Sequence, residues 1–167
     1  KWEAAVVADA EEVAVDLGIR LLQAEGTVIH PFQIHRGKAL YGLFSRNAPM
    51  VEDAIHSLKE GGFPRLNATA NQSAWRLGQA FQDILCQNEQ GVNDYLAEQL
   101  SRERKGYHSG VFLNLDLLAV AKIAARWNLK VELDTIECPK ELIVPEETDY
   151  SSVEIPIPKE GFPWDGL

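Results

Sequence analysis

Hydrophobic positions recur along most of this chain at the three- and four-residue spacing of amphipathic helices. The most apolar stretch is 111–127, in which only Asn114, Asp116, Lys122 and Arg126 are polar. Lys122 and Arg126 are four residues apart and share one helical face, while the other faces are Leu, Ala, Val and Ile. A helix that is apolar nearly all round belongs inside a domain, and Asn114 is suited to cap its start. We therefore expect this stretch to form the central core helix.

Before the core helix, the same spacing predicts a series of amphipathic helices separated by turn residues. A short interval separates the last two, which favours antiparallel neighbours. The tryptophans Trp2, Trp75 and Trp127 are expected to be core aromatics on their helices. The predicted helices are residues 2–25, 36–46, 47–60, 69–87 and 92–105.

Local signals set the boundaries of these helices. Gly26 is suited to end the first, because glycine tolerates a left-handed backbone. Residues 27–34 are β-branched and broken by Pro31, which predicts an extended connection or an edge strand. Asn47 is suited to cap the third helix, and Gly61-Gly62 to end it.

The pattern changes after the core helix. Residues 129–135 alternate apolar and charged side chains, which predicts a short strand-like segment. After Ile143, prolines punctuate acidic and β-branched residues and predict extended segments. The sequence therefore predicts a mainly α, single-domain helical bundle with antiparallel helix pairs. Its helical domain is 1–143, and an irregular acidic extension, 144–167, packs on it.

The charge of the chain is unevenly placed. Residues 1–131 carry 14 basic and 15 acidic side chains, whereas residues 132–167 have a net charge of −8. This distribution argues against direct nucleic-acid binding, which requires a basic face. It is compatible with a basic protein partner, although a solvated acidic tail that only keeps the chain soluble is the alternative.

Composition also indicates a compartment. The longest apolar stretch is too short and too charged to span a bilayer, and no signal peptide is evident at the start, so we expect no membrane contact. Cys86 and Cys138 fit no metal-ligand spacing. We therefore expect a cytoplasmic protein with two reduced thiols.

Residues that could carry chemistry are sparse. The four histidines form no HExxH motif or Cys/His quartet, so no metal site or cofactor is expected. The neighbours His108 and Ser109 are not a catalytic dyad by adjacency, because a triad is a spatial arrangement. Paired carboxylates such as Glu132 and Asp134 need desolvation for acid–base work. A hydrolase using His108 or a carboxylate pair is thus the least favoured hypothesis, and no catalytic residue is predicted.

The stretch 113–143 resembles the closing signature of the immunity protein 49 family, bacterial antidotes encoded beside polymorphic toxins. That signature joins a Leu/Ala helix, a short acidic strand and a Pro-x-x-Leu-Leu ending. Asn128 stands where the family has Gly, and Asn also tolerates the left-handed backbone of that turn. Helices within 36–58 resemble the family's short helix pair, so the likeness covers roughly residues 36–143. The matching positions are Val131, Glu132, Asp134, Pro139 and Leu142.

The resemblance implies a helical, non-enzymatic inhibitor of a polymorphic or type VI secretion toxin. It would bind one cognate toxin, often a nuclease, and cover or deform its active or substrate-binding surface. A helical scaffold or regulatory interaction module without a toxin partner is the alternative, and homo-oligomerisation stays open. The basic toxin is expected to meet acidic residues after the core helix, or apolar anchors near residue 167. The predicted partner-binding residues are Glu132, Asp134, Glu137, Glu146, Glu147, Asp149, Phe162 and Trp164.

Overall fold

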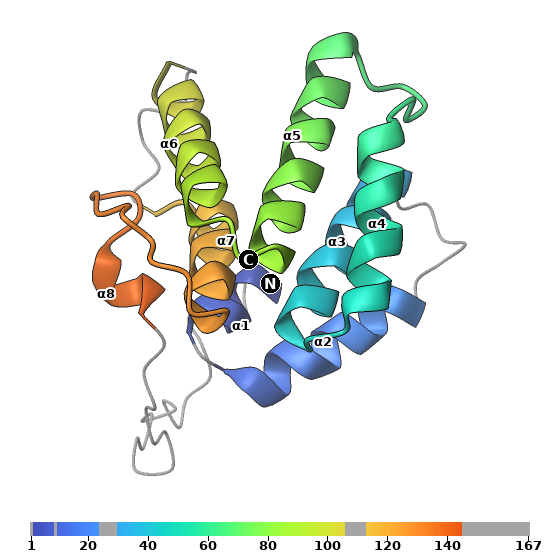
Figure 1. Ribbon diagram of the computed structural model, residues 1–167. Coiled ribbons are helices and arrows are strands. Elements are labelled where there is room, and N and C mark those ends of the chain that lie inside the picture. Colours follow the sequence, from blue (N-terminus) through green and yellow to red (C-terminus); the bar gives the residue numbers. More distant parts are fainter. Residues whose placement is uncertain (1, 9, 24–29, 106–112, 145–167) are drawn as a thin grey trace, which may run out of the picture.

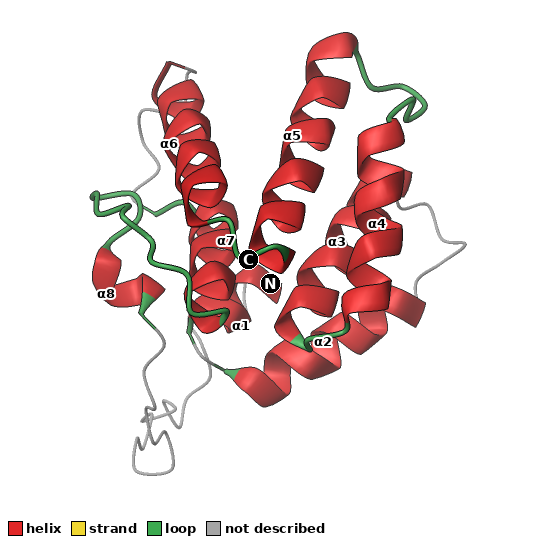
Figure 2. Cartoon of the chain, in the orientation of Figure 1, coloured by secondary structure: helices red, strands yellow, loops and turns green. Residues whose placement is uncertain are grey.

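A computed structural model describes residues 2–8, 10–23, 30–105 and 113–144, which form helices joined by short loops (Figure 1). Figure 2 shows no strand within these ranges, which confirms the predicted mainly α, single-domain fold. None of the described helices is long and apolar enough to cross a membrane. The helices are α1 (Trp2–Val7), α2 (Glu11–Gln23), α3 (Pro31–Phe44), α4 (Ala48–Glu60), α5 (Ala68–Leu85), α6 (Glu89–Lys105), α7 (Leu115–Arg126) and α8 (Lys140–Ile143).

The helices pack largely with their neighbours in sequence. α3 and α4 form an antiparallel pair, α5 packs on α4, and α2 runs across the base of this group (Figure 1). α5 and α6 also run antiparallel, joined by a three-residue connection, residues 86–88. They diverge toward the start of α5 and the end of α6. The predicted antiparallel pairing across this short connection is confirmed.

The core is centred on α7, as its apolar pattern predicted. Every residue from Leu117 to Ala124 is buried, and α1, α3, α6 and α8 all pack against this helix. The Asn114 side chain caps its start by accepting a hydrogen bond from the Leu117 amide at 3.0 Å. Cys138 is buried beside this core, whereas Cys86 is exposed, and neither takes part in a disulfide.

The prediction of one helix over residues 2–25 is wrong in one respect, because the helix is interrupted between α1 and α2. The Ala10 amide donates to the Ala5 carbonyl at 2.9 Å, and this wider turn ends the regular helical ladder. Lys122 of α7 reaches the end of α1, where its Nζ donates to the Val7 carbonyl at 2.8 Å. Lys122 and Arg126 share one face of α7 through their four-residue spacing, but Lys122 lies inside the core and is only 2% exposed. Gly26 lies outside the described residues.

The prediction of an extended segment at Pro31 is also wrong for the part of 27–34 that the structure describes. Pro31 begins α3, where its missing N–H costs no helical hydrogen bond. His30 caps the helix, because its Nδ1 accepts a hydrogen bond from the Phe32 amide at 3.2 Å. Its Nε2 lies 2.7 Å from the carbonyl oxygen of Pro64, which ties this helix start to the loop before α5.

The predicted boundaries of α4 are confirmed. Asn47 Oδ1 accepts from the Met50 amide at 3.3 Å, and Gly61 and Gly62 follow the helix with φ of 67° and 75°. The tryptophan prediction is wrong for Trp75, which is 45% exposed. Trp127 is partly buried and donates from its indole to the Leu43 carbonyl at 2.9 Å. The side chain of Trp2 lies outside the described part.

Candidate partner-binding surface

The segment 129–138, which carries the acidic part of the family-like signature, lies extended along α6. Asn128 lies just after the end of α7 and has a left-handed backbone, φ 62°, as predicted, and the chain turns there. Leu129 is buried, and Val131 and Leu133 are partly buried against the core. The alternating pattern therefore places one face of the segment against the core and the other toward solvent.

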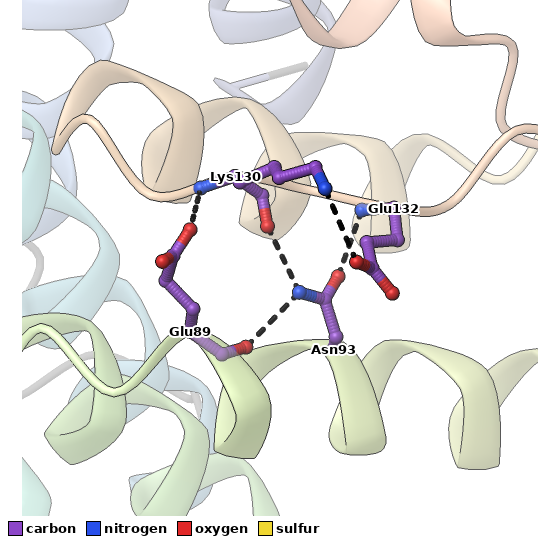
Figure 3. A network of polar contacts seen from close by, with 4 residues as sticks. All are labelled: Glu89, Asn93, Lys130 and Glu132. Atoms are coloured by element: carbon purple, nitrogen blue, oxygen red, sulfur yellow. Dashed lines mark hydrogen bonds and ion pairs between the residues drawn. The ribbon is translucent and has the colours of Figure 1, made fainter.

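No strand partner holds this segment within the described residues, so the predicted strand is not formed. Side chains of α6 take the place of a neighbouring strand (Figure 3). Asn93 Nδ2 donates to the Lys130 carbonyl, and Asn93 Oδ1 accepts from the Glu132 amide, both at 2.9 Å. The Glu89 carboxylate accepts from the Lys130 amide. One amide side chain thus supplies the donor and the acceptor that a strand would supply.

The outward face of the segment combines carboxylates with one conspicuous apolar side chain. The side chain of Glu132 is 66% exposed and lies 3.5 Å from the Lys130 ammonium. Asp134 is exposed, and its Oδ1 accepts from the Lys140 amide at 3.3 Å, which stabilises the start of α8. Ile136 is 82% exposed. A single exposed apolar side chain is ordinary on a protein surface, so Ile136 marks an apolar point on the acidic face and not by itself a binding site.

Glu137 has a different role from its two acidic neighbours. Arg104, in the last turn of α6, donates to both of its carboxylate oxygens, at 3.0 and 2.9 Å. This hydrogen bonding, helped by a backbone hydrogen bond, lowers the pKa of Glu137 from 4.5 to about 2. Its own carbonyl accepts from the Asn114 amide at 2.9 Å. Glu137 therefore fastens the segment to α6 and to the start of α7, and its charge is largely compensated.

The structure thus separates the predicted partner-binding residues. Glu132 and Asp134 share the solvent side of the segment, whereas Glu137 is engaged within the fold. Sequence reasoning missed Ile136, Glu89 and Asn93. The period-two alternation of the segment could have indicated Ile136, because it continues the outward series of Glu132 and Asp134. The remaining predicted residues, Glu146, Glu147, Asp149, Phe162 and Trp164, lie outside the described residues, as does the predicted extension from 145 onward.

The described residues give little support to a metal site or to catalysis by histidine. Across the described ranges, no group of three or more His, Cys, Asp or Glu side chains is placed to hold a metal ion. His30 serves as a helix cap and His56 pairs with Glu60 at 3.1 Å. His108 and Ser109 lie outside the described residues.

Comparisons of this chain with family models, with curated proteins and with solved structures find no match.

Proposed function

We propose that this chain is an immunity protein that binds and neutralises a cognate bacterial toxin in the cytoplasm. The toxin is a nuclease with a basic surface, and the inhibitor acts by occluding its active or substrate-binding surface. The observation that carries the proposal is the outward face of the segment 129–138. There Glu132, Asp134 and Ile136 project from a backbone fixed to α6.

The residues of the family-like signature divide between packing and surface. Val131 and Leu142 are partly buried against the core, and Pro139 precedes α8. Glu132 and Asp134 project into solvent. The apolar half of the signature thus packs within the fold, and its acidic half is exposed where a partner can reach it.

Electrostatics favour a basic partner. A nuclease must carry cationic groups to hold phosphates, and exposed carboxylates can compete for those groups. Opposite charges also steer the encounter and raise the association rate at low salt. Ile136 adds an apolar anchor beside Glu132 and Asp134, and anchors that become desolvated on binding supply much of the binding energy in interfaces.

The test is co-expression with the toxin domain encoded beside this chain. We expect growth to be rescued and the two proteins to co-purify. Glu132→Lys combined with Ile136→Ser is expected to weaken the complex by roughly 10- to 100-fold and to reduce its salt dependence. Glu52→Lys on the exposed side of α4 is the control, because it makes the same charge reversal elsewhere.

The outcomes separate the alternatives. Death of the cells despite abundant folded protein would sink the proposal. If the double substitution does not affect rescue, the interface lies elsewhere than on the segment 129–138. Stable association with a non-toxic partner, without protection, would favour a helical scaffold or regulatory module.

A further inference from the structure

The other side of α6 forms a second acidic site, together with α5. These two helices line an open pocket of about 240 Å³. Trp75 contributes an exposed indole ring, and the carboxylates of Asp83, Asp94 and Glu98 also line the pocket. Asn93, which holds the segment 129–138, precedes Asp94 on the same helix. Successive residues turn by about 100°, so the pocket residues of α6 lie on the face opposite to Glu89 and Asn93, which hold the segment.

Asp83 is the most unusual of these groups, because it is a carboxylate that is only 8% exposed. Its Oδ1 accepts hydrogen bonds from Gln79 Nε2 at 3.2 Å and from Asn88 Nδ2 at 2.9 Å. Within the described chain its Oδ2 accepts no hydrogen bond and no cation pairs with it. Burying a carboxylate is costly unless a positive charge or full hydrogen bonding compensates it. Asp83 is held in place through Oδ1, and its Oδ2 is left as an acceptor in the lining of the pocket.

The charges around Asp83 favour a cation from outside. Glu98 is compensated by Arg76 and Arg102. Asp94 accepts only from the neutral Gln90 amide, at 2.7 Å, in the part of the chain that the structure describes. The pocket lining thus holds three carboxylates and one guanidinium. Its net negative charge attracts a positively charged group.

Trp75 determines which kind of cation suits the pocket. Its indole already attracts the Lys59 ammonium, which lies 5.6 Å from the ring centroid. Trp75 lies eight residues before Asp83 on α5, about 12 Å along the helix axis, so a cation that uses both needs a long side chain. Arginine fits, because its aliphatic stem can pack on the indole while its guanidinium donates two hydrogen bonds at the carboxylate.

We propose that this pocket binds an arginine side chain of a protein partner. Asp83 Oδ2 accepts the guanidinium hydrogen bonds, the Trp75 ring packs on the aliphatic stem of the arginine, and Asp94 adds charge at the rim. The identity of the partner as the toxin rests on the proposed function, but the binding of arginine by the pocket does not.

The first experiment tests the pocket alone, with N-acetyl-arginine amide as the probe. NMR spectra of the protein report the Trp75 indole N–H and the Gly91 amide during the titration. We expect saturable shifts with a Kd of roughly 1–10 mM, as for one weakly held small group. The neutral analogue N-acetyl-citrulline amide is expected to bind at least about tenfold more weakly, because it lacks the charge.

Two variants assign the binding to the named residues. Asp83→Asn keeps the shape of the side chain and is expected to abolish saturation. Trp75→Leu is expected to weaken binding about fivefold, read from the Gly91 amide. Asp53→Asn, an exposed position on α4, removes the same charge and should leave the titration unchanged. If Asp83→Asn disturbs the spectrum of the free protein, Asp94→Asn replaces it, with an expected weakening of about threefold.

Equal shifts with the citrulline analogue, or binding that survives both acidic substitutions, would overturn the inference. Co-purification with the toxin distinguishes this failure from that of the proposed function. If the probe binds but no toxin complex forms, the arginine pocket is supported and the toxin as partner is rejected. If the probe does not bind and the toxin complex is unaffected by Asp83→Asn, only the arginine pocket is rejected.

Discussion

Lys122 and Val7 are 115 positions apart in the chain, yet the Lys122 ammonium donates to the Val7 carbonyl at 2.8 Å. Val7 is the last residue of α1, so its carbonyl lies at a helix end where intrahelical donors are missing. A cation at this end also suits the negative pole of the helix. The contact explains how a lysine is kept inside the core and why α1 docks on α7.

Replacing Lys122 is expected to destabilise the fold although the substitute is apolar. Lys122→Met keeps the volume but leaves the Val7 carbonyl without this donor, which costs about 1–3 kcal/mol in the free energy of unfolding. Urea denaturation followed by circular dichroism measures the loss. Lys105→Met, at an exposed position of α6, is the control and should stay within about 0.5 kcal/mol of the wild type. Equal stability of the two variants would contradict the structural role of Lys122.

Asn93 is expected to hold the segment 129–138 on α6. Asn93→Ala removes hydrogen bonds to Lys130 and Glu132 and should cost about 1–2 kcal/mol. The protection of the Glu132 amide against hydrogen exchange should fall about tenfold, because 1.4 kcal/mol corresponds to a factor of ten. Ser101→Ala, on the exposed side of the same helix, should leave this protection unchanged. Unaltered exchange at Glu132 in the Asn93 variant would show that core packing alone holds the segment.

Gly42 sets the close approach of α3 and α4. A Cβ at this position would lie 2.7 Å from Val51 Cγ2, well inside normal contact. Gly42→Ala is therefore expected to destabilise the protein by about 1–3 kcal/mol, although alanine favours helix more than glycine does. Adding Val51→Ala should recover part of this loss, because it removes the clashing methyl group. A double-mutant cycle measured by urea denaturation tests the coupling, and simple additivity would contradict it.

The ion pair between Arg104 and Glu137 is expected to make the stability of the fold depend on pH. The pKa of Glu137 is lowered in the fold, from 4.5 to about 2, so the ionised carboxylate stabilises the folded state at pH values above 4.5. This contribution is lost as the pH falls from 4.5 through about 2, where the folded protein takes up the proton. The unfolding midpoint of Glu137→Gln should lie below that of the wild type near neutral pH, and the gap should close in this acidic window. Glu141→Gln, at an exposed position nearby, should show no such gap.

The sequence determined the features that depend on neighbours along the chain. Asn47 and Asn114 cap their helices because an Asn side chain reaches the amides of the next turn. Gly61 and Gly62 end α4 because they accept positive φ. The burial of residues 117–124 follows from their apolar composition on every face. The outward placement of Glu132 and Asp134 follows from period-two alternation, whatever holds the backbone.

Only the tertiary structure decided the features that need a partner distant in the chain. Residues 129–135 have a strand pattern, but a ladder requires a second strand, and the partner here is Asn93 of α6. The break after Val7 accompanies its contact with Lys122, which no local periodicity signals. The open Asp83 carboxylate arises where α5 meets α6. Local signals report backbone preference within one or two turns, whereas packing between helices decides which polar groups are satisfied within the fold.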